Sequence, residues 1–206
     1  MAARTLPMFP LGTVLLPGQA LPLHVFESRY RALTADCLAR DRELGIVLIE
    51  RGHEVGGGDT RFSVGTLARI VRAAELPDGR SLIVAVGSAR VGIRRWLGED
   101  PYPSAEVEVL EEPPAPPDDR DRREELHRAL ARVLALRTEL GEPVPRGARP
   151  LDDPSLAAYE AATVAGMGPL DAQRLLELDD PGARLDAVRA WLEEEAEVLG
   201  FRLSRP

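Results

Sequence analysis

Residues 7–30 read PMFPLGTVLLPGQALPLHVFESRY, and this stretch decides the fold. It is mostly apolar and contains four prolines, each of which fixes its own φ angle, lacks an N–H group and disfavours helix in the residue before it. The stretch therefore predicts short extended segments at Leu6 to Phe9, Leu11 to Leu16 and Ala20 to Leu23. Because buried backbone groups need hydrogen-bond partners, later strands must pair with these segments.

The following residues supply one helix and then the expected strands. Apolar residues recur at helical spacing from Glu27 to Arg40. Strand patterns follow at Gly45 to Ile49, Val64 to Ala74, Ser81 to Val86, Arg90 to Trp96 and Ala105 to Leu110. The LPDGR sequence at residues 76–80 is a turn signal that joins two of them as a hairpin. Strands that do not alternate regularly with helices favour a closed or half-closed β-barrel with one embedded helix.

The second half of the chain is expected to be helical. Residues 111–117 read EEPPAPP, which favours an extended connector over a strand or a helix. We therefore predict a β-barrel subdomain at 1–112, a connector at 113–117 and a bundle of about four helices at 118–206, an α+β fold. The helices are expected at Asp118 to Leu140, from Asp153-Pro154 onward, at Pro169 to Leu178, and from Asp180-Pro181 to just before Gly200.

Charge and composition exclude several classes of protein. The net charge is −8, and all 26 basic residues are arginine because the sequence contains no lysine. Neither half is basic, since residues 1–110 hold 13 Arg against 13 acidic residues and residues 111–206 hold 13 Arg against 21. A nucleic-acid partner is therefore not expected. No membrane span or secretory signal is evident, which predicts a cytoplasmic protein.

Cysteine and histidine, which supply many catalytic and metal-binding side chains, are few in this sequence and lie far apart along it. The single cysteine, Cys37, falls on the apolar face of the first predicted helix and is expected to be buried and inert. His24, His53 and His127 lie in three separate elements, which does not favour a metal site or a nucleophile-base pair. No cofactor or metal is expected.

Three further groups of residues are interpreted as structural features. Gly56, Gly57 and Gly58 favour a tight connection over a phosphate cradle, because no helix start or basic side chain follows them. Glu27, Arg29 and Glu54 are expected to tie the first helix to that glycine loop through charged hydrogen bonds. The acidic run at residues 193–197 is interpreted as a solvated helix face, with a docking surface for a basic partner as the alternative.

The apolar residues near the N-terminus form the candidate binding groove. They exceed what one strand face can bury, so some are expected to line an exposed groove between the barrel and the bundle, and a large exposed apolar patch usually indicates a partner. The alternative is that all of them enter the core. The candidates are Phe9, Leu11, Leu15, Leu16, Leu23, Phe26 and Tyr30.

These motifs together resemble a known family. The run from Pro7 to Leu38, the later segments DRELGIVLI, EVGGG, VGTLARI and LPDGR, and the C-terminal LLELDDPGARLDAVRAWLEEE are similar to the N-terminal substrate-binding domain of Lon proteases. The resemblance extends from about residue 6 to about residue 199 and implies a PUA-like pseudo-barrel followed by a helical bundle. Ser28 departs from the proline that the family often has after its Phe-Glu pair.

The resemblance implies a stand-alone, non-catalytic module that binds unfolded or apolar polypeptide segments. An ATPase needs a phosphate loop with lysine, and the Lon peptidase uses a serine activated by lysine; a chain without lysine has neither. The expected partners are polypeptide clients or a protease or chaperone, with no nucleic acid and no membrane, and a weak homodimer stays open. The alternatives are a PUA-like RNA binder, a small-molecule-binding domain and a cryptic hydrolase.

Overall fold

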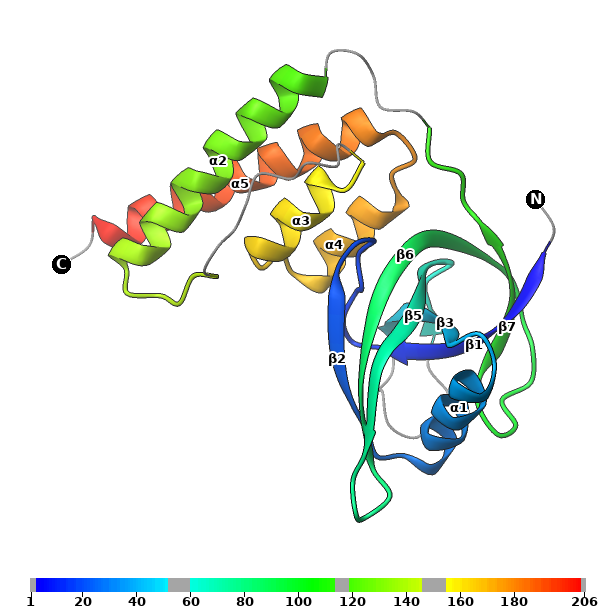
Figure 1. Ribbon diagram of the computed structural model, residues 1–206. Helices are drawn as coiled ribbons and strands as arrows, with labels where there is room; N and C mark the ends of the chain where they lie inside the picture. Colours follow the sequence, from blue (N-terminus) through cyan, green and yellow to red (C-terminus); the bar gives the residue numbers. More distant parts are fainter. Residues whose placement is uncertain (1–2, 52–59, 114–118, 146–154, 205–206) are drawn as a thin grey trace. The chain divides into compact units, whose positions relative to one another are not determined.

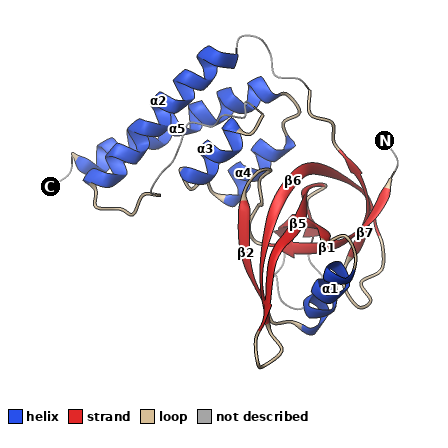
Figure 2. Cartoon of the chain, viewed as in Figure 1, coloured by secondary structure: helices blue, strands red, loops and turns tan. Residues whose placement is uncertain are grey.

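The computed structural model describes residues 3–51, 60–113, 119–145 and 155–204. The chain forms two compact units, Met1–Glu111 and Glu112–Pro206. The described part of the first contains seven strands and one helix, and that of the second contains four helices (Figures 1 and 2). The predicted α+β fold is confirmed.

The strands of the first unit pair in a ring, against which α1 packs. β1 pairs with β7, β7 with β6, β6 with β5 and β5 with β3, all antiparallel, and β3 returns to β1 in parallel. The short β4 pairs with β3, and β2 pairs with β6. The elements are β1 (Arg4–Leu11), β2 (Ala20–Val25), α1 (Ser28–Ala39), β3 (Glu43–Arg51), β4 (Thr60–Arg61), β5 (Val64–Glu75), β6 (Ser81–Trp96) and β7 (Ser104–Val109).

Two apolar clusters fill this unit. One joins α1 to the strands through Tyr30, Leu33 and Cys37, which face Phe9, Ile83 and other strand residues. The other lies between β1, β3, β5, β6 and β7. Side chains alternate along β7, because Ala105 and Val107 are fully buried while Glu106 and Glu108 pair with Arg95 and Arg94 of β6.

Two predictions about the strands were wrong. Leu11 to Leu16 is not one extended segment, since β1 ends at Leu11 and residues 12–19 form bends and a turn. Ser81 to Val86 and Arg90 to Trp96 are not separate strands, since β6 runs unbroken through Gly87. A Cβ atom at Gly87 would lie 2.7 Å from the Leu16 carbonyl oxygen, so glycine permits the close approach of the 12–19 segment and does not break the strand.

The helices of the second unit mostly begin and end as their terminal residues predict. They are α2 (Asp119–Glu139), α3 (Ala157–Val164), α4 (Pro169–Glu177) and α5 (Pro181–Leu203). Gly141, with φ +73°, follows α2, and the Asp180 carboxylate accepts a hydrogen bond of 2.8 Å from the Ala183 N–H at the start of α5. The Asp153-Pro154 pair lies outside the described residues.

Gly200 does not end the last helix. α5 continues to Leu203, and the Gly200 carbonyl accepts the Ser204 N–H at 3.1 Å. Glycine stops a helix when it takes a left-handed conformation, and the left-handed glycines of the described chain do not include Gly200. Leu199 is buried, so packing sustains the helix across this position.

One arginine is buried in the second unit. Arg184 of α5 is 1% exposed, and its guanidinium donates to the carbonyls of Leu178 and Asp179 and to the carboxylate of Glu112 at 2.6 Å. It also lies 5.1 Å from the ring centre of Tyr159. These contacts fasten the first residue of the unit and the α4–α5 turn to α5.

Candidate binding surface

The seven candidate groove residues do not all lie together. Five of them line a small hollow of about 200 Å³ between the end of β1, β2 and the start of α1: Phe9, Leu11, Leu23, Phe26 and Tyr30. The other two, Leu15 and Leu16, are buried beneath β5 and β6, where the Thr66 hydroxyl donates to the Leu15 carbonyl at 2.5 Å. The apolar stretch is thus divided between core and surface.

Of the five candidate residues that line the small hollow, only Phe26 is strongly exposed. Phe9 and Tyr30 are buried and stack with ring centres 4.1 Å apart. Phe26 is 55% exposed, and its ring lies edge-on to the His24 ring with the ring centres 6.1 Å apart. Phe26 is therefore the side chain of this set that is placed to meet a ligand.

Two members of the predicted charged tie, Glu27 and Arg29, pair with each other at the start of α1. Arg29 donates to the Glu27 carboxylate at 3.1 Å, and its guanidinium lies 4.5 Å from the ring centre of Tyr30. This pair holds the start of α1 over the aromatic stack. Glu54 and the Gly56–Gly58 run lie outside the described residues, so their part in the tie stays a prediction.

A larger hollow adjoins the small one on the same strand. It has a volume of about 970 Å³ and is bordered by β2, β5, β6 and the C-terminal end of α1. Pro22, Leu23 and His24 line both hollows, so β2 forms their shared border. Apart from His24, Arg42 and Arg72, the larger lining is entirely aliphatic.

The sequence pattern did not single out the exposed residues of the larger hollow. Val71 is 48% exposed and Leu82 is 46% exposed, although both belong to strand patterns that predict burial. Val71 is the extra residue at a shift in the β5–β6 register, between the paired Ile70 and Arg72. A bulge of this kind redirects a side chain, and the sequence carries no clear signal for it.

The edge of β2 beside the hollows is open to a further strand. Within the described chain, β2 pairs only with β6, in a register from Ala20–Val86 to Val25–Ser81. Pro22 lacks an N–H group, which limits the hydrogen bonds that this edge can offer and protects it against uncontrolled strand pairing.

Cys37 and the two histidines that the structure describes lie on three different elements. Cys37 is buried, and desolvation with the nearby Asp41 and Asp36 charges raises its thiol pKa to about 12. His24 lies on β2 and His127 on α2, while His53 is outside the described residues. No group of three potential metal ligands occurs in the described ranges, and no helix there is long and apolar enough to cross a membrane.

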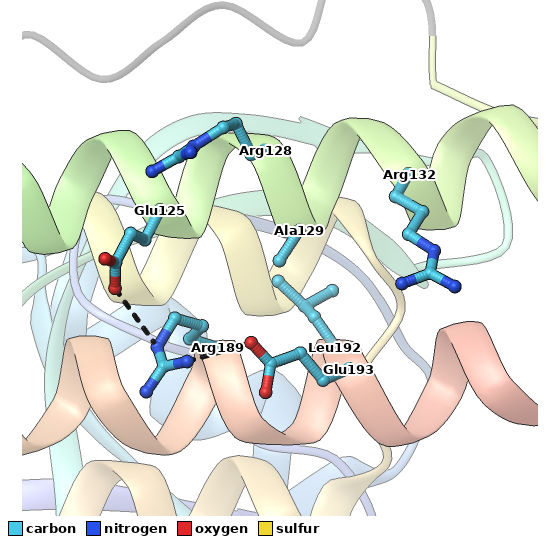
Figure 3. Close-up of a pocket in the computed structure, with 7 residues that line it drawn as sticks. All are labelled: Glu125, Arg128, Ala129, Arg132, Arg189, Leu192 and Glu193. Atoms are coloured by element: carbon cyan, nitrogen blue, oxygen red, sulfur yellow. Dashed lines mark hydrogen bonds and ion pairs between the residues drawn. The ribbon is translucent and has the colours of Figure 1, made fainter.

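The helical unit contains a different hollow, of about 390 Å³, between α2 and α5 (Figure 3). Its apolar part is Ala129 and Leu192, which face each other across the two helices. Arg189 lies between two carboxylates, 3.7 Å from Glu125 and 2.8 Å from Glu193. Five of the seven lining residues are charged, three arginines and two glutamates, so this hollow suits an apolar segment less well than the larger one on the first unit.

Solved structures define the class of fold. A Lon N-terminal domain protein from Xanthomonas campestris matches with a TM-score of 0.67 and 29% identity, covering 91% of this chain and 98% of that one. The N-terminal domain of a Mycobacterium avium complex Lon protease has the same fold, with a TM-score of 0.66 and 22% identity over 93% of this chain and 99% of its own.

The family follows from the sequence comparison. The family described as the ATP-dependent protease La (LON) substrate-binding domain matches residues 5–194, and the chain belongs to it. The Lon protease of Trichlorobacter lovleyi is 31% identical over 206 residues, which is 96% of this chain and 25% of that protein. The Lon protease of Escherichia coli is 30% identical over 205 residues, 94% of this chain and 25% of its own length. The predicted resemblance is confirmed, and the chain spans about a quarter of these relatives.

Proposed function

We propose that this chain is a non-catalytic recognition module that binds unfolded or apolar polypeptide segments in the larger hollow of its first unit. The observation that carries the proposal is an aliphatic hollow of about 970 Å³ in which Val71 and Leu82 leave about half of their side chains exposed. Concave apolar surfaces of this size usually serve binding. Membership of a substrate-binding domain family supports the same conclusion.

The geometry favours an extended segment. The hollow is bordered by strands, and the outer edge of β2 runs along it, so a client chain in an extended conformation can lie beside β2 with alternate side chains directed into the two hollows. Pro22 interrupts the hydrogen-bonding edge, so apolar contacts carry more of the affinity than backbone hydrogen bonds. Recognition that rests on apolar contacts tolerates many sequences, as unfolded clients require.

We expect the affinity to be moderate. Each apolar client side chain that is fully buried contributes about 1.5–3 kcal/mol, and association costs roughly 4–15 kcal/mol. Four side chains at about 3 kcal/mol each, against a cost of about 4 kcal/mol, leave roughly 8 kcal/mol, which corresponds to a dissociation constant on the order of micromolar at best. By analogy with the relatives named Lon protease, the bound segments are proposed to be clients for proteolysis.

The test compares two exposed aliphatic sites with matched substitutions. A fluorescein-labelled 15-residue peptide that alternates Leu or Phe with Ser is titrated with the protein and followed by fluorescence anisotropy. The double variant Val71→Gln/Leu82→Gln is expected to weaken binding at least about tenfold, because about two apolar contacts are lost. Val198→Gln is the control, since Val198 is 55% exposed on α5.

The controls make the outcome specific. Both variants must keep the far-ultraviolet circular dichroism of the parent, because exposed aliphatic residues add little to the core. An unchanged affinity in Val71→Gln/Leu82→Gln, or an equal loss in Val198→Gln, contradicts binding at the larger hollow.

A further inference from the structure

The exposed arginines of the first unit fall into two groups. Arg80, Arg94 and Arg95 each pair with a carboxylate of Asp78, Glu108 or Glu106. The others have no carboxylate within ion-pair distance among the described residues: Arg31, Arg40, Arg42, Arg69 and Arg72. All five of these lie on α1, on the turn after it or on β5.

Two of the unpaired arginines line the larger hollow. Arg42 and Arg72 are part of its lining, and no described residue of that lining carries a carboxylate. Backbone contacts hold the turn after α1 beside β5. The Ile70 N–H donates to the Arg42 carbonyl at 2.9 Å, and Glu43 of β3 is opposite Arg69 of β5 in the strand register. We call Arg42 and Arg72 the cationic rim of the hollow.

The backbone fixes Arg42 at this rim. Its φ angle is +65°, and its N–H donates to the Cys37 carbonyl at 2.9 Å, so the turn that ends α1 is held by a hydrogen bond. A left-handed conformation is uncommon for arginine, and glycine or asparagine adopts it more easily. The position thus carries a charged side chain where a smaller residue is easier to accommodate.

We infer that the cationic rim makes the hollow selective for apolar segments that also carry Asp or Glu side chains. The inference rests on the proposed function and names the class of client. Residues 1–110 hold 13 Arg against 13 acidic residues, so the acidic surplus of the chain lies in its second half and the first unit does not repel an acidic segment as a whole. At the rim, the guanidinium groups of Arg42 and Arg72, which have no carboxylate within ion-pair distance among the described residues, lie beside aliphatic walls and match a carboxylate next to apolar side chains.

The same rim does not favour a nucleic acid. Single-stranded nucleic acid binds through a cationic groove that also presents aromatic rings on which the bases stack. The lining of the larger hollow holds no Phe, Tyr or Trp residue, and the exposed Phe26 belongs to the small hollow. Aliphatic walls with a cationic rim fit a polypeptide.

The experiment uses three peptides with the same apolar core, in which the interspersed polar residues are all Glu, all Gln or all Lys. We expect the Glu peptide to bind about fivefold more tightly than the Gln peptide at low salt, because each exposed charge pair contributes modestly. The Lys peptide is expected to bind more weakly than the Gln peptide. The preference should shrink in 0.5 M NaCl, since salt screens exposed charges.

Two double variants with the same change in charge separate the rim from the overall charge. Arg42→Gln/Arg72→Gln is expected to abolish the preference for Glu over Gln while leaving the affinity for the Gln peptide within about twofold. Arg94→Gln/Arg95→Gln removes two exposed arginines from the other end of β6 and is expected to keep the preference.

Each negative result contradicts a different claim. Binding of the Gln peptide without a preference for Glu overturns the acidic selectivity and leaves the proposed function intact. Absence of binding for all three peptides overturns both. Poly-uridylate RNA that binds more tightly than the Glu peptide and depends on Arg42 and Arg72 overturns the selectivity for polypeptide and assigns the rim to nucleic acid.

Discussion

At the scale of single residues, Cys37 shows how burial sets the chemistry of a side chain. It lies on the inner face of α1, is 2% exposed, and its Sγ donates to the Glu43 carbonyl at 3.3 Å. Removal of the thiolate from water is unfavourable, so burial raises the thiol pKa from 9.0 to about 12. The thiol is therefore protonated in the folded protein at physiological pH and is a poor nucleophile, as its place in the sequence predicts.

This shift in pKa predicts how stability changes with pH. Above pH 9 the unfolded chain loses the Cys37 proton and the folded chain retains it, so the free energy of unfolding falls as the pH rises from about 9 to about 12. The Cys37 contribution is present in full below pH 9 and is lost through this range, with a slope of up to roughly 1.4 kcal/mol per pH unit. Urea unfolding curves recorded at several pH values measure the slope.

Cys37→Ala is the control for this prediction. The variant is less stable at every pH because it leaves a small cavity, but it should lack the Cys37 part of the slope between pH 9 and pH 10. Tyr102 adds a slope of its own mainly above pH 10, since burial and its hydrogen bond to Asp36 at 2.6 Å raise the phenol pKa from 10.0 to about 12. Equal slopes in the parent and Cys37→Ala would contradict the assignment.

At the scale of elements, helix ends were the features most readily predicted from the sequence. Asp180-Pro181 signals a helix start through the side chain and backbone of two adjacent residues, and α5 begins there. The length of β6 was not predicted, because Gly87 is determined by the approach of Leu16, 71 positions earlier in the chain. The exposure of Val71 and Leu82 was not predicted for a similar reason. It depends on the pairing register of the strands and on which neighbouring residues cover the two side chains.

The cap of α5 supplies a prediction at this scale. Asp180→Ala removes the acceptor of the Ala183 N–H and is expected to lower the free energy of unfolding of the helical unit by about 1 kcal/mol. Asp180→Asn keeps a side-chain oxygen and should cost only a few tenths of that. Urea unfolding followed by circular dichroism at 222 nm measures both variants. An equal loss in Ala and Asn would show that charge, and not the hydrogen bond, stabilises the start of the helix.

At the scale of the whole molecule, the chain consists of two units with different means of stabilisation. The first is held by strand pairing around two apolar clusters, and the second by helix packing and the buried Arg184 network. Each unit contains one of the two tryptophans, Trp96 on β6 and Trp191 on α5. The sequence indicated the change from strands to helices at the proline-rich segment but could not indicate Arg184, whose burial depends on the carbonyls that surround it.

We propose that the two units unfold independently, and the two tryptophans allow a direct test. In a Trp191→Phe background, the fluorescence of Trp96 reports the first unit, and Gly87→Ala should destabilise it by about 2 kcal/mol because the new methyl group meets the Leu16 carbonyl. In a Trp96→Phe background, Trp191 reports the second unit, and Arg184→Met should cost about 2–3 kcal/mol because two carbonyls and Glu112 lose their donor.

The crossed measurements decide between independent and coupled unfolding. Gly87→Ala should leave the urea midpoint reported by Trp191 unchanged, and Arg184→Met should leave the midpoint reported by Trp96 unchanged, because units that unfold separately share no stability. Coincident transitions that move together in both variants would show that each unit stabilises the other. Binding of a client to the first unit would then stabilise the second by mass action, an effect that independent units exclude.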